Sequence, residues 1–174
     1  MTPEIIFPLD LVLGYVAWLL CFGAYIWPRL REMDSVHAQR AIATLHSFRF
    51  IGLVFLVPGV VGPHLPANFA GFAAYWDLAT ALLAILALLT VRVKSLFRFF
   101  VTAFNLVGTV DLLLDYRHAT SGGLRAMPGE LGAAFVIPVL IVPLLMITHI
   151  AAFYLLYRSG SAAQRAFSTE GIRG

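Results

Sequence analysis

A small set of polar side chains lies inside otherwise apolar segments, and these residues carry the chemistry that the sequence offers. They are Cys21, His46, Arg49, Asn105 and His149. Ionisable groups are expensive in hydrocarbon, so a membrane protein that retains an arginine and two histidines there is expected to use them. The pattern predicts a buried polar site inside the bilayer, near the cytoplasmic leaflet, without identifying a reaction.

Arg49 places the strongest demand on its surroundings. It shares a helix face with His46, because the two are spaced i, i+3, and it keeps its charge in proteins, so it needs an anion, a carbonyl or water. We expect no acidic residue at its depth. Its partner is then Asn105 with the backbone, or a bound phosphate, carboxylate or propionate. In the competing interpretation Arg49 reaches back to the cytoplasmic headgroups.

The two histidines, taken singly, favour interhelical hydrogen bonds to Asn105 or Thr148. Taken together, at matching depth on different segments, they favour a shared site. One of them would act as general acid or base on a lipophilic ligand, because the histidine pKa lies near neutrality. In this hypothesis Arg49 anchors an anionic or carbonyl group and Asn105 orients it, with Cys21 as a further ligand-binding residue.

Two other functions stay open. His46 and His149 could be the axial ligands of a b-type haem in an electron-transfer protein, with Arg49 near a propionate. Alternatively, the protein is a non-catalytic membrane subunit whose polar residues only hold helices together. Zinc is less favoured, because its ligands would have to converge from three segments. No other cofactor or metal is predicted, and whether the protein is an enzyme stays open.

A second, outer cluster is expected at the opposite ends of the segments. It contains His64, Asp77, Asp111 and Asp115. Asp111 and Asp115 lie on one helix face, at i, i+4. The cluster could bind a divalent cation or admit protons. In the simpler interpretation its members are solvated near the exterior headgroups, except Asp111, which is expected to lie deeper. The pairs Asp77 with Arg117 or Asp111 with His64 are then expected.

The composition places these residues in a membrane protein. The chain is 60% hydrophobic and 12% charged, with a mean hydropathy of +0.88, far more apolar than soluble domains. Its partners are expected to be the lipid bilayer, a lipophilic small molecule and a second copy or a larger membrane complex. Nucleic acid is not expected, because the basic residues lie singly between apolar runs.

The elements that must position the site are apolar segments separated by charges and prolines. They predict an all-α, polytopic transmembrane bundle in one domain over residues 1–158, followed by a polar, flexible cytoplasmic tail at 159–174. The final segment is longer than a hydrocarbon core needs, so Pro138 and Pro143 are expected to kink it. The five spans are expected at about 5–27, 41–61, 69–91, 99–114 and 131–157.

The orientation follows from the lysines and arginines of the loops. One side carries Arg29, Arg31, Arg40, Arg92, Lys94, Arg98, Arg158, Arg165 and Arg173, whereas the other carries Arg117 and Arg125. This asymmetry predicts a multi-pass protein of the cell membrane with its N-terminus outside and its C-terminus in the cytoplasm.

Overall fold

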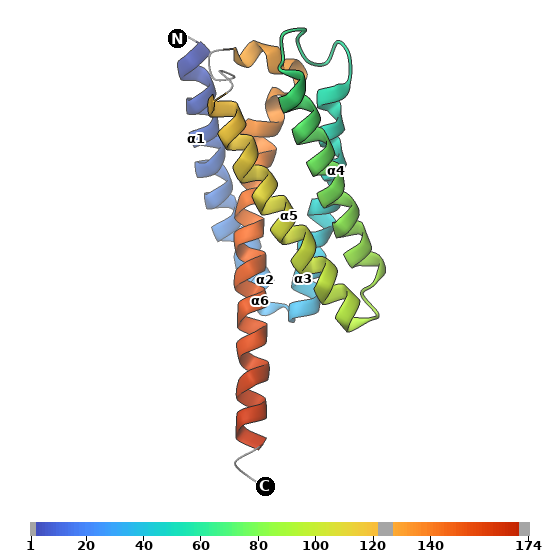
Figure 1. Cartoon of the computed structure of the whole chain (residues 1–174). Helices are drawn as coiled ribbons and strands as arrows, with labels where there is room; N and C mark the ends of the chain where they lie inside the picture. The colour runs from blue at the N-terminus through green and yellow to red at the C-terminus, as the bar shows by residue number, and fades with distance from the viewer. Residues whose placement is uncertain (1–2, 122–126, 171–174) are drawn as a thin grey trace.

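The chain folds into a bundle of helices, as seen in a computed structural model (Figure 1). The structure describes residues 3–121 and 127–170, with side chains over 5–119 and 127–160. Within these ranges the secondary structure is helical and contains no strand, which confirms the all-α class. Arg125 and Arg173 lie outside the described residues.

Four described helical segments are long and apolar enough to cross a membrane. They are Ile5–Glu32, Ala67–Leu89, Lys94–Ala119 and Ile137–Gly160. The elements, in chain order, are α1 (Pro3–Cys21), η1 (Phe22–Ile26), α2 (Trp27–Glu32), α3 (Ser35–His46), η2 (Ser47–Leu56), α4 (Ala67–Leu89), α5 (Lys94–Ser121), η4 (Pro128–Phe135), η5 (Ile137–Ile141) and α6 (Val142–Glu170).

The second predicted segment, 41–61, differs most from its expected form. It begins earlier, at Ser35, because the Asp34 carboxylate accepts hydrogen bonds from the backbone N–H groups of Val36 and His37 at 3.0 and 3.1 Å. Such a cap satisfies the free donors of a helix start. After His46 the α-helix gives way to the 3₁₀ helix η2, which is 10 residues long and therefore unusual, since most 3₁₀ runs are short.

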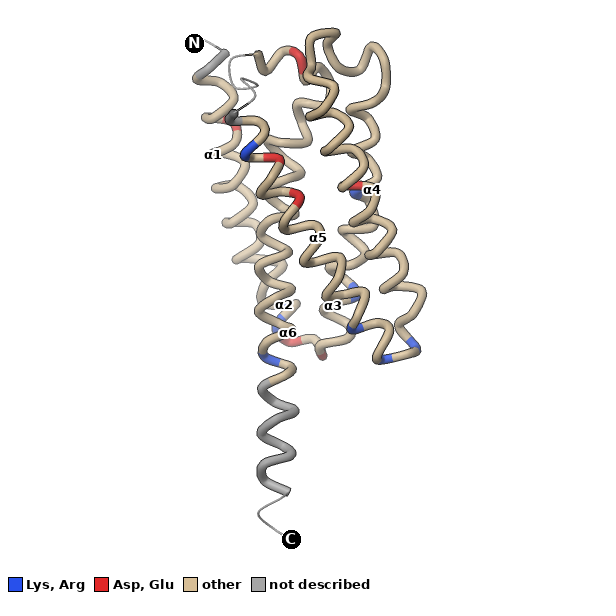
Figure 2. Tube along the Cα trace, in the orientation of Figure 1, with Lys and Arg blue, Asp and Glu red and all other residues tan. Residues whose placement is uncertain are grey.

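The elements run back and forth along one direction. α1 begins at one end of the bundle, α3 and α5 run opposite to α4, and α6 ends far from the start of α1 (Figure 1). Lysines and arginines gather mainly at the end where α2 meets α3 and α4 meets α5, which we call the basic end (Figure 2). The other end is closed by the connection between η2 and α4.

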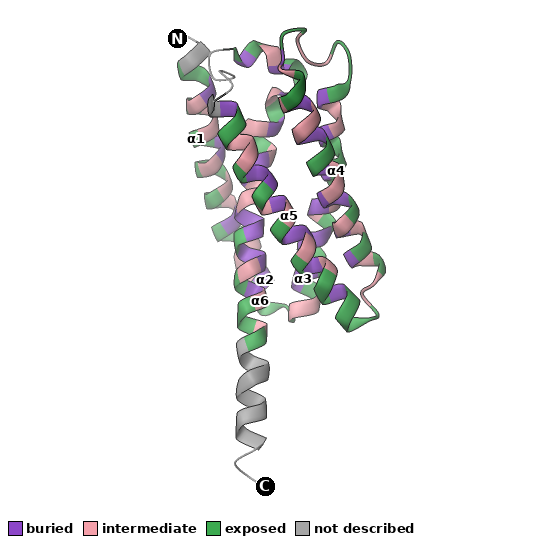
Figure 3. Ribbon diagram, viewed as in Figure 1, coloured by how far each residue is buried: buried purple, intermediate pink, exposed green. Residues whose placement is uncertain are grey.

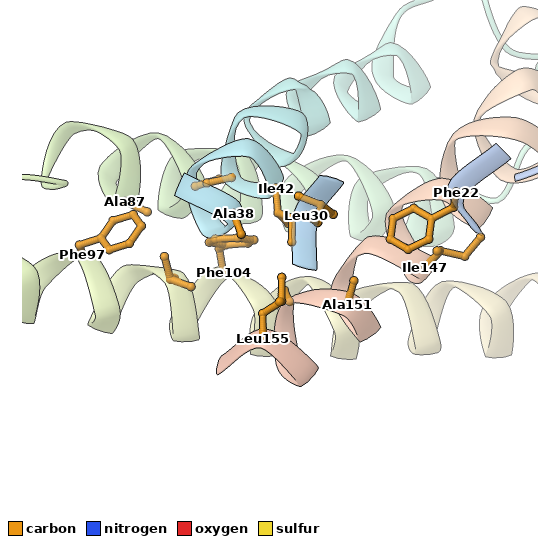
Figure 4. Close-up of a cluster of buried hydrophobic side chains, with 14 residues drawn as sticks. Phe22, Leu30, Ala38, Ile42, Ala87, Phe97, Phe104, Ile147, Ala151 and Leu155 are labelled. Atoms are coloured by element: carbon orange, nitrogen blue, oxygen red, sulfur yellow. The ribbon is translucent and has the colours of Figure 1, made fainter. Parts of the chain in front are cut away.

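Buried apolar side chains form two clusters, one toward each end of the bundle. The cluster at the basic end includes Ala38 and Ile42 of α3, Phe104 of α5 and Ala151 of α6, whose side chains point toward one another (Figure 4). Buried residues face inward along every helix (Figure 3). α4 contributes mainly alanines, which let neighbouring helices approach closely.

The predicted kink before α6 takes a specific form. The chain passes through the π-helical turn η5 just before Pro143, and the indole N–H of Trp18 donates to the carbonyl of Leu140 at 2.8 Å. Gly14 lies so close to this turn that a Cβ added to it would be 2.0 Å from the carbonyl oxygen of Val139. The irregular turn is therefore one of the contacts that hold α1 on the bundle, together with the hydrogen bond between the Tyr15 and Tyr116 hydroxyls.

The connection between η2 and α4 packs on η4. The backbone N–H of Gly62 donates to the carbonyl of Glu130 at 2.7 Å, and the backbone N–H of Ala133 donates to the carbonyl of Val60 at 3.1 Å. Gly132 has a φ of +50°, and a Cβ there would be 2.1 Å from the carbonyl oxygen of Val60. Only glycine satisfies both the backbone conformation and the approach.

Candidate functional site

Arg49 enters the bundle because η2 is a 3₁₀ helix. The buried residues of η2 are Arg49, Gly52 and Phe55, a spacing of three that places them on one face when a turn contains three residues. This face packs mainly against α4. Arg49 is 2% exposed, so its guanidinium lies inside the bundle and not at its lipid-facing surface.

Two aspartates pair with Arg49. Oδ1 of Asp77, on α4, lies 2.6 Å from both Nε and Nη2 of the guanidinium. Oδ2 of Asp111, on α5, lies 2.5 Å from Nη2. Nη1 donates to the carbonyl of Gly108 and to Nε2 of His149, each at 3.3 Å. Each nitrogen of the guanidinium therefore has a hydrogen-bonding partner from the protein itself.

Two glycines provide the space for these charges. A Cβ at Gly52 would lie 2.2 Å from Oδ2 of Asp77. A Cβ at Gly108 would lie 2.6 Å from Nη1 of Arg49 and 2.6 Å from Nε2 of His149. Both positions therefore require glycine for close approach, in helical backbone that would otherwise accept any residue.

A neutral group of side chains continues the network toward the basic end. His149 Nδ1 lies 2.8 Å from Oδ1 of Asn105, and the Asn105 amide donates to the carbonyl of Val101 at 2.8 Å. Because the Asn105 oxygen accepts, the Nδ1 of His149 carries the proton and its Nε2 accepts from Arg49. His46 Nε2 lies 3.0 Å from the hydroxyl of Thr148.

We call Arg49, Asp77 and Asp111 the charged part of the network, and His46, Asn105, Thr148 and His149 the neutral part. Along the chain, each residue of the charged part lies between a member of one apolar cluster and a member of the other. It links η2, α3, α4, α5 and α6, so each of these elements contributes at least one hydrogen-bonding or charged group.

Several buried polar atoms in and beside the network lack a hydrogen-bonding partner among the described residues. They are Oε1 of Gln39, Nδ1 of His46, Oγ1 of Thr109, Oδ1 of Asp111 and Oδ1 of Asp115. Buried polar groups are normally satisfied, so such atoms mark places for water, protons or a ligand. Asp111 is fully buried, so its Oδ1 is the atom that most needs a hydrogen-bonding partner.

Two cavities reach the charged part. One, of about 270 Å³, lies between η2 and the start of α6, and Arg49 and Asp77 are its only charged lining residues. Its other walls are apolar, and Phe48, Phe50 and Ile51 on its η2 side are exposed. A smaller cavity, of about 40 Å³, lies on the other side of Asp77 and is also lined by Asp115 and Tyr116.

The structure brings together four of the predicted inner residues: His46, Arg49, Asn105 and His149. Cys21 is half-buried at the end of α1, and no hydrogen bond of the described residues joins it to the network.

The outer cluster does not form as a separate group. Asp77 and Asp111 pair with Arg49 and not with Arg117 and His64. Asp115 lies one turn beyond Asp111. The exposed His64 lies in the η2–α4 connection, where its backbone N–H donates to Oε2 of Glu130 at 2.9 Å.

The expectation that no acidic residue lies at the depth of Arg49 was therefore wrong. Its segment starts at Ser35, not Ala41, and extends by about 2 Å per residue in η2. Arg49 then lies about 20 Å past the start of α3, in the middle of the bundle, at the level of the two aspartates.

The geometry does not fit a haem held between the two histidines. Two axial metal–imidazole bonds of about 2 Å each would separate the two ligating nitrogens by about 4 Å, and the ring centroids behind them would lie farther apart still. The ring centroids of His46 and His149 are only 4.1 Å apart. The ring nitrogens of His149 are also both engaged. In the described part of the chain, no group of three or more His, Cys, Asp or Glu residues could hold a metal ion.

Comparison with known proteins places the chain in a family. The family described as "Domain of unknown function (DUF8737)" matches residues 6–157, and the chain belongs to it. The match covers every residue of the charged and neutral parts. No curated protein and no solved structure matches the chain.

Proposed function

We propose that this family member binds a lipophilic molecule inside the membrane, in the cavity of about 270 Å³ between η2 and α6. The observation that carries the proposal is the lining of that cavity. Apolar walls meet one charged edge, made by Arg49 and Asp77, as expected of a small-molecule site in which few polar groups fix the ligand's orientation.

The head group of the ligand follows from the contacts of Arg49. Its guanidinium already has two carboxylates, a carbonyl and an imidazole as partners, so an anionic ligand would have to displace one of them. Oδ2 of Asp77 can still accept a hydrogen bond. The cavity is thus better suited to a head group that donates hydrogen bonds or carries positive charge.

Binding is favoured over chemical modification of the ligand. His46 and His149, the two general acid–base candidates, are not among the residues lining this cavity. They lie on other faces of the network, where they contact Thr148, Asn105 and Arg49.

We further propose that the chain crosses the membrane five times, with its N-terminus outside. α3 has 12 residues and η2 has 10, which at about 1.5 and 2.0 Å per residue give about 38 Å. A hydrocarbon core of about 30 Å needs less. The basic end then faces the cytoplasm, in agreement with the positive-inside rule.

The test compares three probes with the same dodecyl chain, namely dodecylamine, dodecanol and dodecanoate. Each is equilibrated with the protein in lipid nanodiscs and with empty nanodiscs at neutral pH. We expect excess binding in the order amine, alcohol, carboxylate. Asp77→Asn should abolish the preference for the amine, and Leu145→Trp, which fills the cavity, should abolish the excess for all three probes. Leu113→Trp, on the exposed face of α5, is the control.

Two outcomes would contradict the proposal. Preferential binding of dodecanoate would overturn the choice of head group and return Arg49 to its role as an anion anchor. Equal binding of the probes to loaded and empty nanodiscs, together with a melting temperature of Leu145→Trp near that of the parent, would favour the hypothesis of a non-catalytic membrane subunit. The protein partners that Arg49 already has also support that hypothesis.

A further inference from the structure

The charged part carries one negative charge too many. Arg49 contributes one positive charge, whereas Asp77 and Asp111 contribute two negative charges when both are ionised. An uncompensated charge in a low-dielectric interior costs several kcal/mol. The imbalance must be removed by a bound cation or by a proton on one carboxyl group.

The free carboxylate oxygens indicate where that proton lies. Oδ1 of Asp111 and Oδ1 of Asp115 are both buried and without a hydrogen-bonding partner in the described part of the chain. The two residues are one turn apart on α5, so their side chains are neighbours on one face. A proton held on one oxygen and directed at the other, directly or through one water, would satisfy both atoms.

The small cavity offers a route for this proton. The cavity of about 40 Å³ is lined by Asp115, Asp77 and Tyr116 and extends to Ala119 near the end of α5. A cavity of this size has room for a water, for which Asp77, Asp115 and Tyr116 are the polar residues of an otherwise apolar lining. On the basic-end side, the guanidinium of Arg49 lies between Asp111 and His149, and its positive charge repels an incoming proton.

We propose that Asp111 and Asp115 form an intramembrane proton-binding site that is loaded through the small cavity from the end of the bundle opposite the basic end. A hydronium ion transfers its proton to a carboxylate oxygen, an O–H bond forms, and water is released. The site is distinct from the cavity proposed for the lipophilic ligand, and it needs no ligand to operate.

The groups facing the proton come from every neighbouring element. They are Arg49 of η2, Asp77 of α4, His149 of α6, and Asp115 and Tyr116 of α5, with Tyr15 of α1 bonded to Tyr116 at 2.7 Å. Only Arg49 opposes protonation directly. With the proton on Asp111, Arg49 and Asp77 remain as an ion pair of zero net charge, and the Asp115 carboxylate accepts the hydrogen bond from the new hydroxyl.

The experiment is infrared spectroscopy of the protein in liposomes, titrated across neutral pH, in which the C=O stretch of a protonated carboxylic acid is observed directly. We expect this band in the parent protein near neutral pH, a shift of the band in Asp111→Glu, and its loss in the double variant Asp111→Asn, Asp115→Asn. Asp10→Asn, on α1 and outside the network, should retain it. Absence of the band from the parent, or its persistence in the double variant, would overturn the proposal.

The route is tested by the rate at which the band shifts after transfer to D₂O. Ala119→Leu narrows the small cavity and should slow this exchange if the cavity carries the proton. Val110→Leu, on the exposed face of the same helix, is the control. An unchanged rate in Ala119→Leu, with the band still present, would overturn the route. Because no ligand is added, these results are independent of the dodecyl probes.

Discussion

The charged and neutral parts of the network occupy the same interior but depend on different forces. Arg49 holds Asp77 and Asp111 through ion pairing, and neither the guanidinium nor the two aspartates can be left without a partner in the bundle. His46, Asn105, Thr148 and His149 hold helices together through hydrogen bonds between neutral groups. Interhelical bonds of the second kind contribute only modestly in membrane proteins. Removing a member of the charged part should therefore destabilise far more than removing a member of the neutral part.

The largest effect is expected from Arg49→Met. It leaves Asp77 and Asp111 facing each other without a counter-charge, and breaking a buried pair in this way costs about 3–5 kcal/mol. Unfolding in mixed micelles with increasing denaturing detergent measures the loss. Arg40→Met, on the exposed face of α3, should change little.

The triple variant Arg49→Met, Asp77→Asn, Asp111→Asn sharpens this result. Neutralising all three charges together should recover much of the lost stability, because a buried ion pair contributes little net stability over neutral groups of similar size. If Arg49→Met alone matched the parent within about 1 kcal/mol, the charged part would not be buried as described.

A somewhat smaller effect is expected from Gly108→Ala, which affects both parts at once. The added Cβ would lie 2.6 Å from both Arg49 and His149, and overpacking of this kind costs about 1–3 kcal/mol. Gly23→Ala is the matched control, since a Cβ there has nothing within 4 Å. Equal melting temperatures for the two variants would mean that α5 does not approach Arg49 at Gly108.

The neutral part is tested by Thr148→Val, which removes the hydroxyl facing His46 and keeps the shape. We expect a loss of about 0.6 kcal/mol, and at most about 1.7 kcal/mol. Thr44→Val is the comparison, because the Thr44 hydroxyl bonds only to its own helix, at the carbonyl of Arg40. A loss as large as that of Arg49→Met would remove the distinction between the two parts.

The smallest effect is expected at a carboxylate in water, Asp34. Backbone hydrogen bonding to His37, followed by the contact with its side chain, lowers the pKa of Asp34 below its ordinary value. Its contribution to the start of α3 is therefore present above the ordinary pKa and lost as the pH falls through the lowered one. Amide hydrogen exchange of the first turn of α3, compared between mildly acidic and strongly acidic pH, measures the loss, and Asp34→Ala should remove the pH dependence.

The sequence was sufficient to predict the helices and the meeting of His46, Arg49, Asn105 and His149, because apolar runs and buried polar residues are local features. It did not reveal the pairing of Arg49 with Asp77 and Asp111. Those residues were assigned to different depths by counting from opposite ends of their segments, and the 3₁₀ form of η2 has no clear signature in its composition. Charge neutrality was the missed signal, since an arginine in lipid needs an acidic partner and these aspartates lie well inside their segments.

The 3₁₀ geometry of η2 has a mechanical consequence. Refolding its 10 residues as an α-helix would shorten the segment by about 5 Å and turn Phe55 by about 120° relative to Arg49. The shortening would displace the connection between η2 and α4. This connection contacts η4 through the hydrogen bond of Gly62 and the close approach at Gly132. An α-helical η2 would therefore have to turn Phe55 off the face that holds Arg49 and to displace the η2–α4 connection from η4.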